Sequence, residues 1–159
     1  MPLETVYRPE KESVKHNIDV VKAETKAAAE QAKAKEAAVK SMSATYEDMV
    51  KAAGKQAVSE AKSEAKLAED KAKAKVKAAN ERDENLIFDN DEVKAAKARR
   101  DMIKEQGQVH VSNVKAAVKT AEEQAKAEGK HAVAAAETHA DHIEARGEAN
   151  VKLAKSAMK

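Results

Sequence analysis

The stretch that decides the fold is NERDENLIFDN, residues 80–90, because it interrupts two long alanine-rich segments. It contains no alanine, although alanine is the most frequent residue of the chain. Asp89 with Glu92 three residues later resembles a capping box, and Asp91 adds an acidic side chain to the first turn of a helix. The stretch therefore predicts a turn, followed by a new helix that begins near Asn90.

The segments on either side of this turn have the composition of long helices. Residues 10–79 contain no proline and a single glycine, Gly54. Alanine, lysine and glutamate are strong helix formers, and residues 91–159 continue the same composition. Two segments of similar length around one turn predict an all-α fold, a long antiparallel helical hairpin with an alanine-rich coiled-coil interface.

The scarcity of large apolar side chains narrows the fold classes further. The chain has one phenylalanine, two tyrosines and no tryptophan, which cannot fill the space between the layers of a β-sandwich or an α/β sheet. The 30 basic and 28 acidic residues leave a formal net charge of +2, so charge repulsion does not force the chain open. The absence of cysteine excludes disulfides and thiolate catalysis.

Apolar residues at alternating steps of three and four predict the face along which the two helices pack. In the first helix these steps run from Val14 to Ala53, and from Ala57 to Ala79 they lengthen toward an eleven-residue period. A turn centred between Asn85 and Leu86 gives facing residues whose numbers add up to about 171. We place the following residues in the helix–helix interface: Val14, Ile18, Val21, Val39, Met42, Tyr46, Met49, Ile103, Val114, Ala125, Ile143 and Leu153.

A four-helix bundle is the alternative architecture. It would need further breaks at residues 41–45, where Ser43 and Thr45 are suitable N-caps, and at residues 107–113, where valines alternate with polar residues. These breaks divide the chain into helices of unequal length, which match poorly as bundle partners. The hairpin is therefore preferred, with kinks allowed at Gly54 and Gly107.

Two apolar clusters outside the helices suggest self-association. Residues 1–9 contain both prolines and predict an extended N-terminal arm, and residues 80–90 form an acidic tip loop with three consecutive large apolar residues. In a long hairpin the arm and the tip lie at opposite ends, so a head-to-tail neighbour would bring them together. The residues expected in this contact are Leu3, Val6, Tyr7, Leu86, Ile87 and Phe88.

Charged residues give no strong indication of another partner. Lysines two positions apart, as in residues 71–77, point in nearly opposite directions from a helix, so we expect a solvated face and no nucleic-acid partner. His139 and His142 are neighbours on one helical turn and are candidate metal ligands, although no second pair completes a site. We find no nucleophile motif and no phosphate-binding loop, and we therefore expect no enzyme, no cofactor and no small-molecule substrate.

The sequence also bears on localisation. No apolar run reaches the length of a membrane span, and the N-terminus lacks the hydrophobic region of a signal peptide. A soluble cytoplasmic protein is the default expectation, and export without a classical signal peptide stays open. An alanine-rich helix face would bind a membrane surface only weakly.

Three stretches resemble the Ala/Lys/Glu repeats of group 3 late-embryogenesis-abundant proteins: KAETKAAAEQAKAKEAAVK (residues 22–40), EAKSEAKLAEDKAKAKVKAA (60–79) and KAAVKTAEEQAKAEGKHA (115–132). The resemblance implies a stress protectant that is disordered in water and helical on drying. The sequence departs from that pattern because its eleven-residue repeat is not sustained.

We therefore expect a non-enzymatic structural protein, a helical hairpin that self-associates into a filament or bundle. The stress protectant is the second function, and a protein whose helices coat a lipid surface is the third. Circular dichroism in dilute buffer separates the first two, since only the structural hairpin would be helical there.

Overall fold

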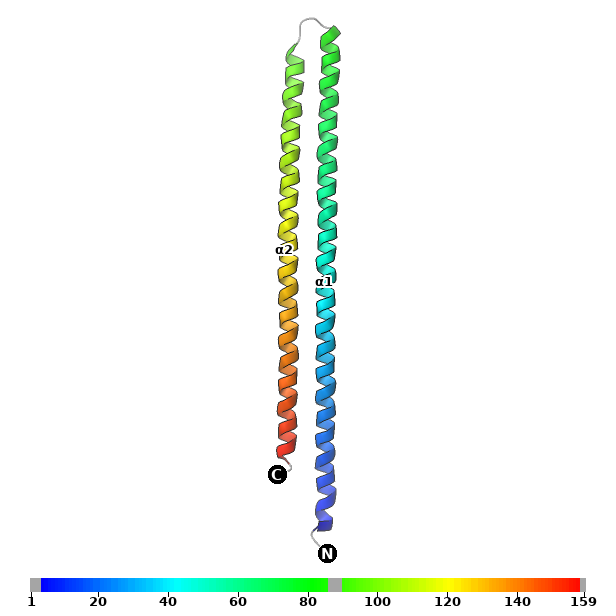
Figure 1. The fold of residues 1–159 in the computed structure, drawn as a ribbon, viewed down its shortest axis with the longest axis vertical. Coiled ribbons are helices and arrows are strands. Elements are labelled where there is room, and N and C mark those ends of the chain that lie inside the picture. The colour runs from blue at the N-terminus through cyan, green and yellow to red at the C-terminus, as the bar shows by residue number, and fades with distance from the viewer. Residues whose placement is uncertain (1–3, 86–89, 158–159) are drawn as a thin grey trace. The chain divides into compact units, whose positions relative to one another are not determined.

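The computed structural model describes residues 4–85 and 90–157, and the side chains of residues 12–82 and 91–157. This part of the chain is helical and contains no strand. Helix α1 spans Glu4–Asn85 and helix α2 spans Asn90–Ser156. The two helices pack against each other as an all-α helical hairpin (Figure 1), which confirms the expected fold class. The chain divides into two compact units. Unit 1 contains residues 1–45 and 126–159, and unit 2 contains residues 46–125.

Both ends of α1 extend beyond the expected helix. Residues 4–9, which we expected to be extended, are helical, and so are residues 80–85 of the expected tip loop. Pro9 therefore lies inside the helix, five residues after its start, where it removes one backbone hydrogen bond close to a helix end. The glutamate and arginine residues around it are strong helix formers, which explains why the helix continues through it.

In unit 2 the two helices run antiparallel with an interface of small residues. Ala61 and Ala72 of α1 and Val93 and Ala125 of α2 are buried. A Cβ atom on Gly107 would lie 3.1 Å from the Cβ of Ala65, and one on Gly54 would clash with Val118. The residue numbers of both facing pairs add up to 172, one more than the expected register.

Unit 1 has the same type of interface. Ile18 and Ala32 of α1 and Ala140 of α2 are buried. Gly147 of α2 lies so close to Thr25 of α1 that an added Cβ would overlap the Thr25 methyl group. Their numbers also add up to 172. The glycines therefore mark positions of close helix approach in both units, and Gly54 and Gly107, where we had allowed kinks, both lie within continuous helices.

The buried positions repeat every eleven residues along both helices. On α2 the inward-facing residues include Ala96, Gly107, Val118, Gly129 and Ala140. On α1 the same spacing begins by Ala32 and continues through residues 43, 54, 65 and 76. An eleven-residue repeat has about 3.67 residues per turn, nearer the 3.6 of an undistorted α-helix than the 3.5 of a heptad. The eleven-residue period therefore extends far beyond the segment in which we expected it.

This period corrects part of the expected interface. Met42, Tyr46 and Met49 are 71%, 50% and 64% exposed, because the inward positions of this segment are residues 43, 47 and 50. Leu153 is 68% exposed, and residues 151 and 154 face inward in its place. The other expected interface residues are buried or half-buried, namely Val14, Ile18, Val21, Val39, Ile103, Val114, Ala125 and Ile143.

The four-helix alternative is wrong. Residues 41–45 and 107–113 both lie within continuous helices. Thr45 does not cap a helix start, since its hydroxyl donates a hydrogen bond of 2.9 Å to the carbonyl oxygen of Ser41 in the preceding turn.

Candidate functional site: a lysine-lined groove

The candidate residues at the two ends are not described in detail. Leu3, Leu86, Ile87 and Phe88 lie outside the described residues. Val6 and Tyr7 belong to helix α1 and not to an extended arm, and their side chains also lie outside the description. The expected contact between arm and tip therefore stays a prediction.

The histidine pair is exposed. His139 and His142 lie on α2 in unit 1, and both side chains face solvent. Among the described residues, no three His, Asp or Glu side chains come close enough to hold a metal ion. Neither described helix contains a stretch apolar enough to cross a membrane.

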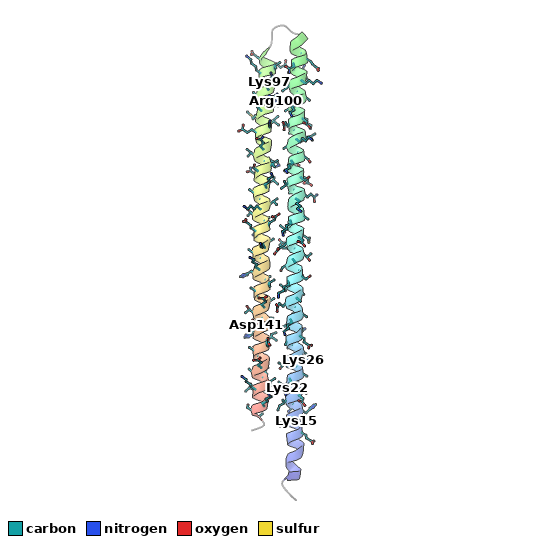
Figure 2. All side chains as sticks on the ribbon, in the orientation of Figure 1. Lys15, Lys22, Lys26, Lys97, Arg100 and Asp141 are labelled. Atoms are coloured by element: carbon teal, nitrogen blue, oxygen red, sulfur yellow. The ribbon has the colours of Figure 1, made fainter. Side chains whose placement is uncertain are left out.

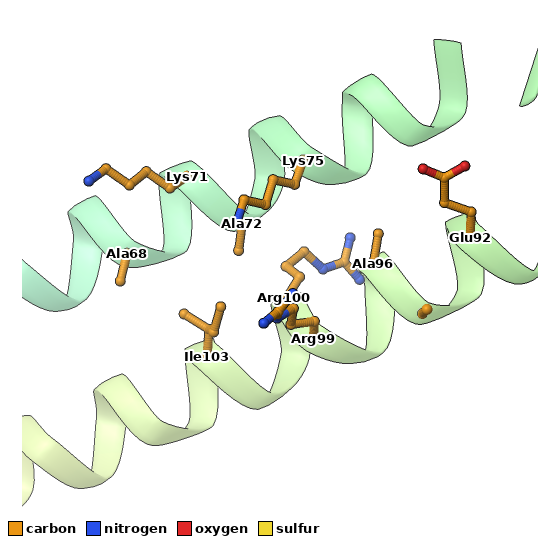
Figure 3. Close-up of a pocket in the computed structure, with 10 residues that line it drawn as sticks. Ala68, Lys71, Ala72, Lys75, Glu92, Ala96, Arg99, Arg100 and Ile103 are labelled. Carbon is orange, nitrogen blue, oxygen red and sulfur yellow. The ribbon is translucent and has the colours of Figure 1, made fainter. Parts of the chain in front are cut away.

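The described side chains project from both helices (Figure 2), and in unit 2 they enclose several depressions. One depression has a floor of Ala68, Ala72, Ala96 and Ile103, and Figure 3 shows Ala72 and Ile103 pointing toward each other across it. Its rim carries Lys71, Lys75, Arg99, Arg100 and Glu92. Arg100 forms an ion pair of 3.0 Å with Asp101, and Glu92 forms one of 2.8 Å with Arg82.

Two further depressions form a lysine-lined groove. They adjoin because both are lined by Lys62 of α1 and Lys115 of α2. The lysines that line this groove are Lys55, Lys62, Lys66, Lys104, Lys115 and Lys119. Within the part of the chain that the structure describes, none of the six forms an ion pair.

The groove arises because lysine recurs at the eleven-residue spacing of the helices. Eleven residues make about three turns, so lysines at this spacing lie on one side of a helix. Separate rows run along each helix: Lys40, Lys51, Lys62 and Lys73; Lys55, Lys66 and Lys77; and Lys104, Lys115 and Lys126. Our sequence interpretation missed these rows, because it compared only lysines that are two residues apart.

Acidic residues of the same segments lie mostly away from the groove. Glu64 is two residues from both Lys62 and Lys66, which places it on another side of α1. It lies 3.8 Å from His110 of α2, which does not line the groove. Two acidic residues do line the groove, Glu122 and Glu69, and Glu69 is paired with Lys73 at 3.1 Å. A neutral composition thus hides a locally basic surface.

The equivalent position in unit 1 carries a compensated lysine. The Nζ atom of Lys40 lies 2.7 Å from Glu36 of the same helix and 3.4 Å from Glu137 of α2. The hydrogen bond to Glu36 and then that to Glu137 raise the pKa of Lys40 above its ordinary value of 10.5. Lys62 lies 22 residues after Lys40, and Lys115 lies 22 residues before Glu137. The same cross-helix position therefore holds two lysines in unit 2.

Large apolar side chains form a second exposed feature. Leu67 of α1 and Met102 and Val109 of α2 are each more than half exposed. In the observed register Leu67 is level with residue 105, between Met102 and Val109. We call these three residues the apolar belt of unit 2. None of them lines the lysine groove.

No protein-family model, curated protein or solved structure matches this chain. The fold and the surface features define its class as an all-α two-helix protein with a small-residue interface, a lysine-lined groove and exposed apolar side chains.

Proposed function

We propose that this chain is a non-enzymatic structural protein whose helical hairpins associate with further copies. The observation that carries the proposal is the inverted distribution of apolar side chains. Alanine and glycine occupy most of the buried positions between the helices, together with Ile18, Val76 and Val93, whereas leucine, methionine and tyrosine side chains are exposed outside the interface. Leu67 and Val109 lie two residues from the inward-facing Ala65 and Gly107, so each points outward from its own helix, where a further copy can contact it.

The energetics favour contact with other copies. Burying an exposed leucine, valine or methionine side chain contributes about 1.5–3 kcal/mol, whereas an alanine methyl group contributes much less. The interface within each unit therefore gives limited stability for its length. Covering the apolar belt with a second copy would add burial that the hairpin alone lacks.

Filament growth would proceed through contacts at the hairpin ends. We propose that the apolar residues 86–88 contact Leu3, Val6 and Tyr7 of a neighbouring copy, as their clustering in the sequence indicates. Light scattering and negative-stain imaging of a variant that lacks residues 1–8 test this part. Filaments that are unchanged in number and length would contradict it.

Sedimentation velocity tests the role of the apolar belt. The variant Leu67→Ser/Val109→Ser should shift the protein to smaller species at a concentration where the wild type assembles. Ala74→Ser/Ala116→Ser is the matched control, since these alanines are also exposed, one on each helix. A wild type that stays monomeric up to high concentration would contradict self-association itself.

The eleven-residue period favours a second candidate function, the stress protectant. The buried positions of this chain follow that period along both helices, which supports the resemblance of the chain to the Ala/Lys/Glu repeat proteins. Circular dichroism separates the candidates: the structural protein is helical in dilute buffer and melts cooperatively, whereas the protectant becomes helical only on drying. Co-sedimentation with liposomes would reveal a lipid-coating function instead.

A further inference from the structure

We propose that the lysine groove of unit 2 binds an extended chain of phosphate groups. The shared chemistry of such a ligand is a row of negative charges with exposed oxygen acceptors, as in inorganic polyphosphate or the backbone of a single-stranded nucleic acid. This proposal goes beyond self-association, which concerns the apolar belt and the hairpin ends.

The first support is an electrostatic imbalance within the interface region. At the cross-helix position of Lys40 and Glu137, the geometry brings a lysine nitrogen and a carboxylate oxygen to 3.4 Å. The equivalent position in unit 2 holds Lys62 and Lys115, and both line the same two depressions. Like charges at such a position repel each other, so an anion between them would replace repulsion by attraction.

The second support is the chemistry of the lining. Besides the six lysines, the groove contains hydrogen-bond donors on Ser59, Gln108 and Ser112. Lysine, serine and glutamine side chains are regular phosphate ligands in nucleic-acid complexes. Of the two acidic residues in the lining, Glu69 already has Lys73 as its partner, which leaves Glu122 as the main local repulsion.

The third support is the spacing of the lysines along the helices. Lys62 and Lys66, and likewise Lys115 and Lys119, are one turn apart, or about 6 Å at 1.5 Å per residue. The groove therefore offers a ladder of positive charges from both helices to a chain that runs parallel to them. No aromatic side chain lines it, so bases would not be stacked and binding would be independent of base sequence.

Fluorescence anisotropy with a labelled single-stranded oligothymidylate at low salt measures binding directly. Unlabelled inorganic polyphosphate, at the same phosphate concentration, is the competitor. We expect Lys115→Glu to weaken binding at least tenfold and to lower the salt dependence of the affinity. Lys75→Glu is the matched control, because it makes the same charge change on the rim of the other depression. It should change the affinity less than twofold.

The two arms distinguish the sources of phosphate. Competition by polyphosphate supports recognition of the phosphate chain alone, and binding of the oligonucleotide without such competition supports a nucleic-acid backbone. Equal weakening by Lys115→Glu and Lys75→Glu, or absence of binding to both probes, would overturn the proposal. Equally strong competition by polyglutamate would also overturn it, since the groove would then accept any polyanion.

Folding and self-association are controlled separately. Circular dichroism melting should show that Lys115→Glu is at least as stable as the wild type, so that lost binding is not lost folding. Lys62→Gln provides a second, milder test in the same groove. Titrations at two protein concentrations, repeated with Leu67→Ser/Val109→Ser, should give the same affinity whether or not the hairpins self-associate.

Discussion

Lys40 in unit 1 and Lys62 in unit 2 occupy the same position of the eleven-residue period. The residue across from Lys40 on α2 is acidic, whereas the residue across from Lys62 is basic. Lys40 lies 3.4 Å from Glu137, whereas Lys62 lines a groove together with Lys115. Each unit also contains a glycine that closely approaches a residue of the other helix, Gly54 in unit 2 and Gly147 in unit 1. One interface geometry can therefore carry either a cross-helix ion pair or an uncompensated basic groove.

The largest expected effect tests whether the packing of the two units is in fact shared. Gly54→Leu in unit 2 and Gly147→Leu in unit 1 should each destabilise the protein by about 1–2 kcal/mol. Overpacking costs about 1–3 kcal/mol, and leucine recovers part of this through its better helix propensity. Urea unfolding measures both effects.

Exposed positions two residues away provide the controls for the glycine variants. Ala52→Leu and Ala145→Leu should change stability by less than about 0.5 kcal/mol. If one glycine tolerated leucine and the other did not, the packing of the units would differ, and the charge comparison would lose its basis.

The next largest effect is expected from a substitution that gives unit 2 the cross-helix charge arrangement of unit 1. Lys115→Glu should stabilise the protein by about 0.2–1 kcal/mol at low salt, the range of an exposed ion pair. Lys115→Gln removes the repulsion without adding an attraction, so its stability should fall between those of the wild type and Lys115→Glu. Thermal melts at increasing salt should bring the three proteins together, because salt screens exposed charges. A destabilised Lys115→Glu would refute the assignment of Lys62 as its neighbour.

The converse change converts unit 1 to the arrangement of unit 2. Glu137→Lys should lower the melting temperature at low salt, and the difference should shrink as salt is added. Glu128→Lys makes the same charge change at another exposed position of α2 and should have the smaller effect. Equal effects of the two variants would mean that only net charge matters.

The smallest effect is a pH dependence centred on Lys40. Because its pKa is raised in the folded state, its contribution to stability is fully present below 10.5 and is lost as the pH rises through the raised pKa. NMR titration of the Lys40 side chain should show that Glu36→Gln lowers this pKa more than Glu137→Gln does. An unchanged Lys40 pKa in both variants would contradict the ion-pair cluster.

Sequence reasoning predicted the helices, their antiparallel pairing and nearly the register. These features depend on strong local signals, namely the alanine-free stretch 80–90 and the helix-forming composition around it. It failed on the phase of the interface between residues 42 and 53. Alanine occurs there on several sides of the helix and does not identify the buried side. We therefore placed the large residues Met42, Tyr46 and Met49 in the interface, although they are exposed.

The lysine groove was missed for a related reason. Nearly equal numbers of acidic and basic residues conceal their segregation, which becomes visible only at the eleven-residue spacing. The spacing of Lys51, Lys62 and Lys73 was present in the sequence. Its meaning required the cross-helix register, because a row on one helix becomes a groove only when the partner helix adds Lys104 and Lys115.

Thermal melting with and without inorganic polyphosphate at low salt tests the central claim most directly. A ligand that binds only the folded state raises the melting temperature, and the shift grows with the logarithm of the ligand concentration above its dissociation constant. Polyphosphate should raise the melting temperature of the wild type and have little effect on Lys115→Glu, which already melts higher without it. Equal shifts in the two proteins, or no shift in the wild type, would contradict the account of unit 2 as an uncompensated basic groove.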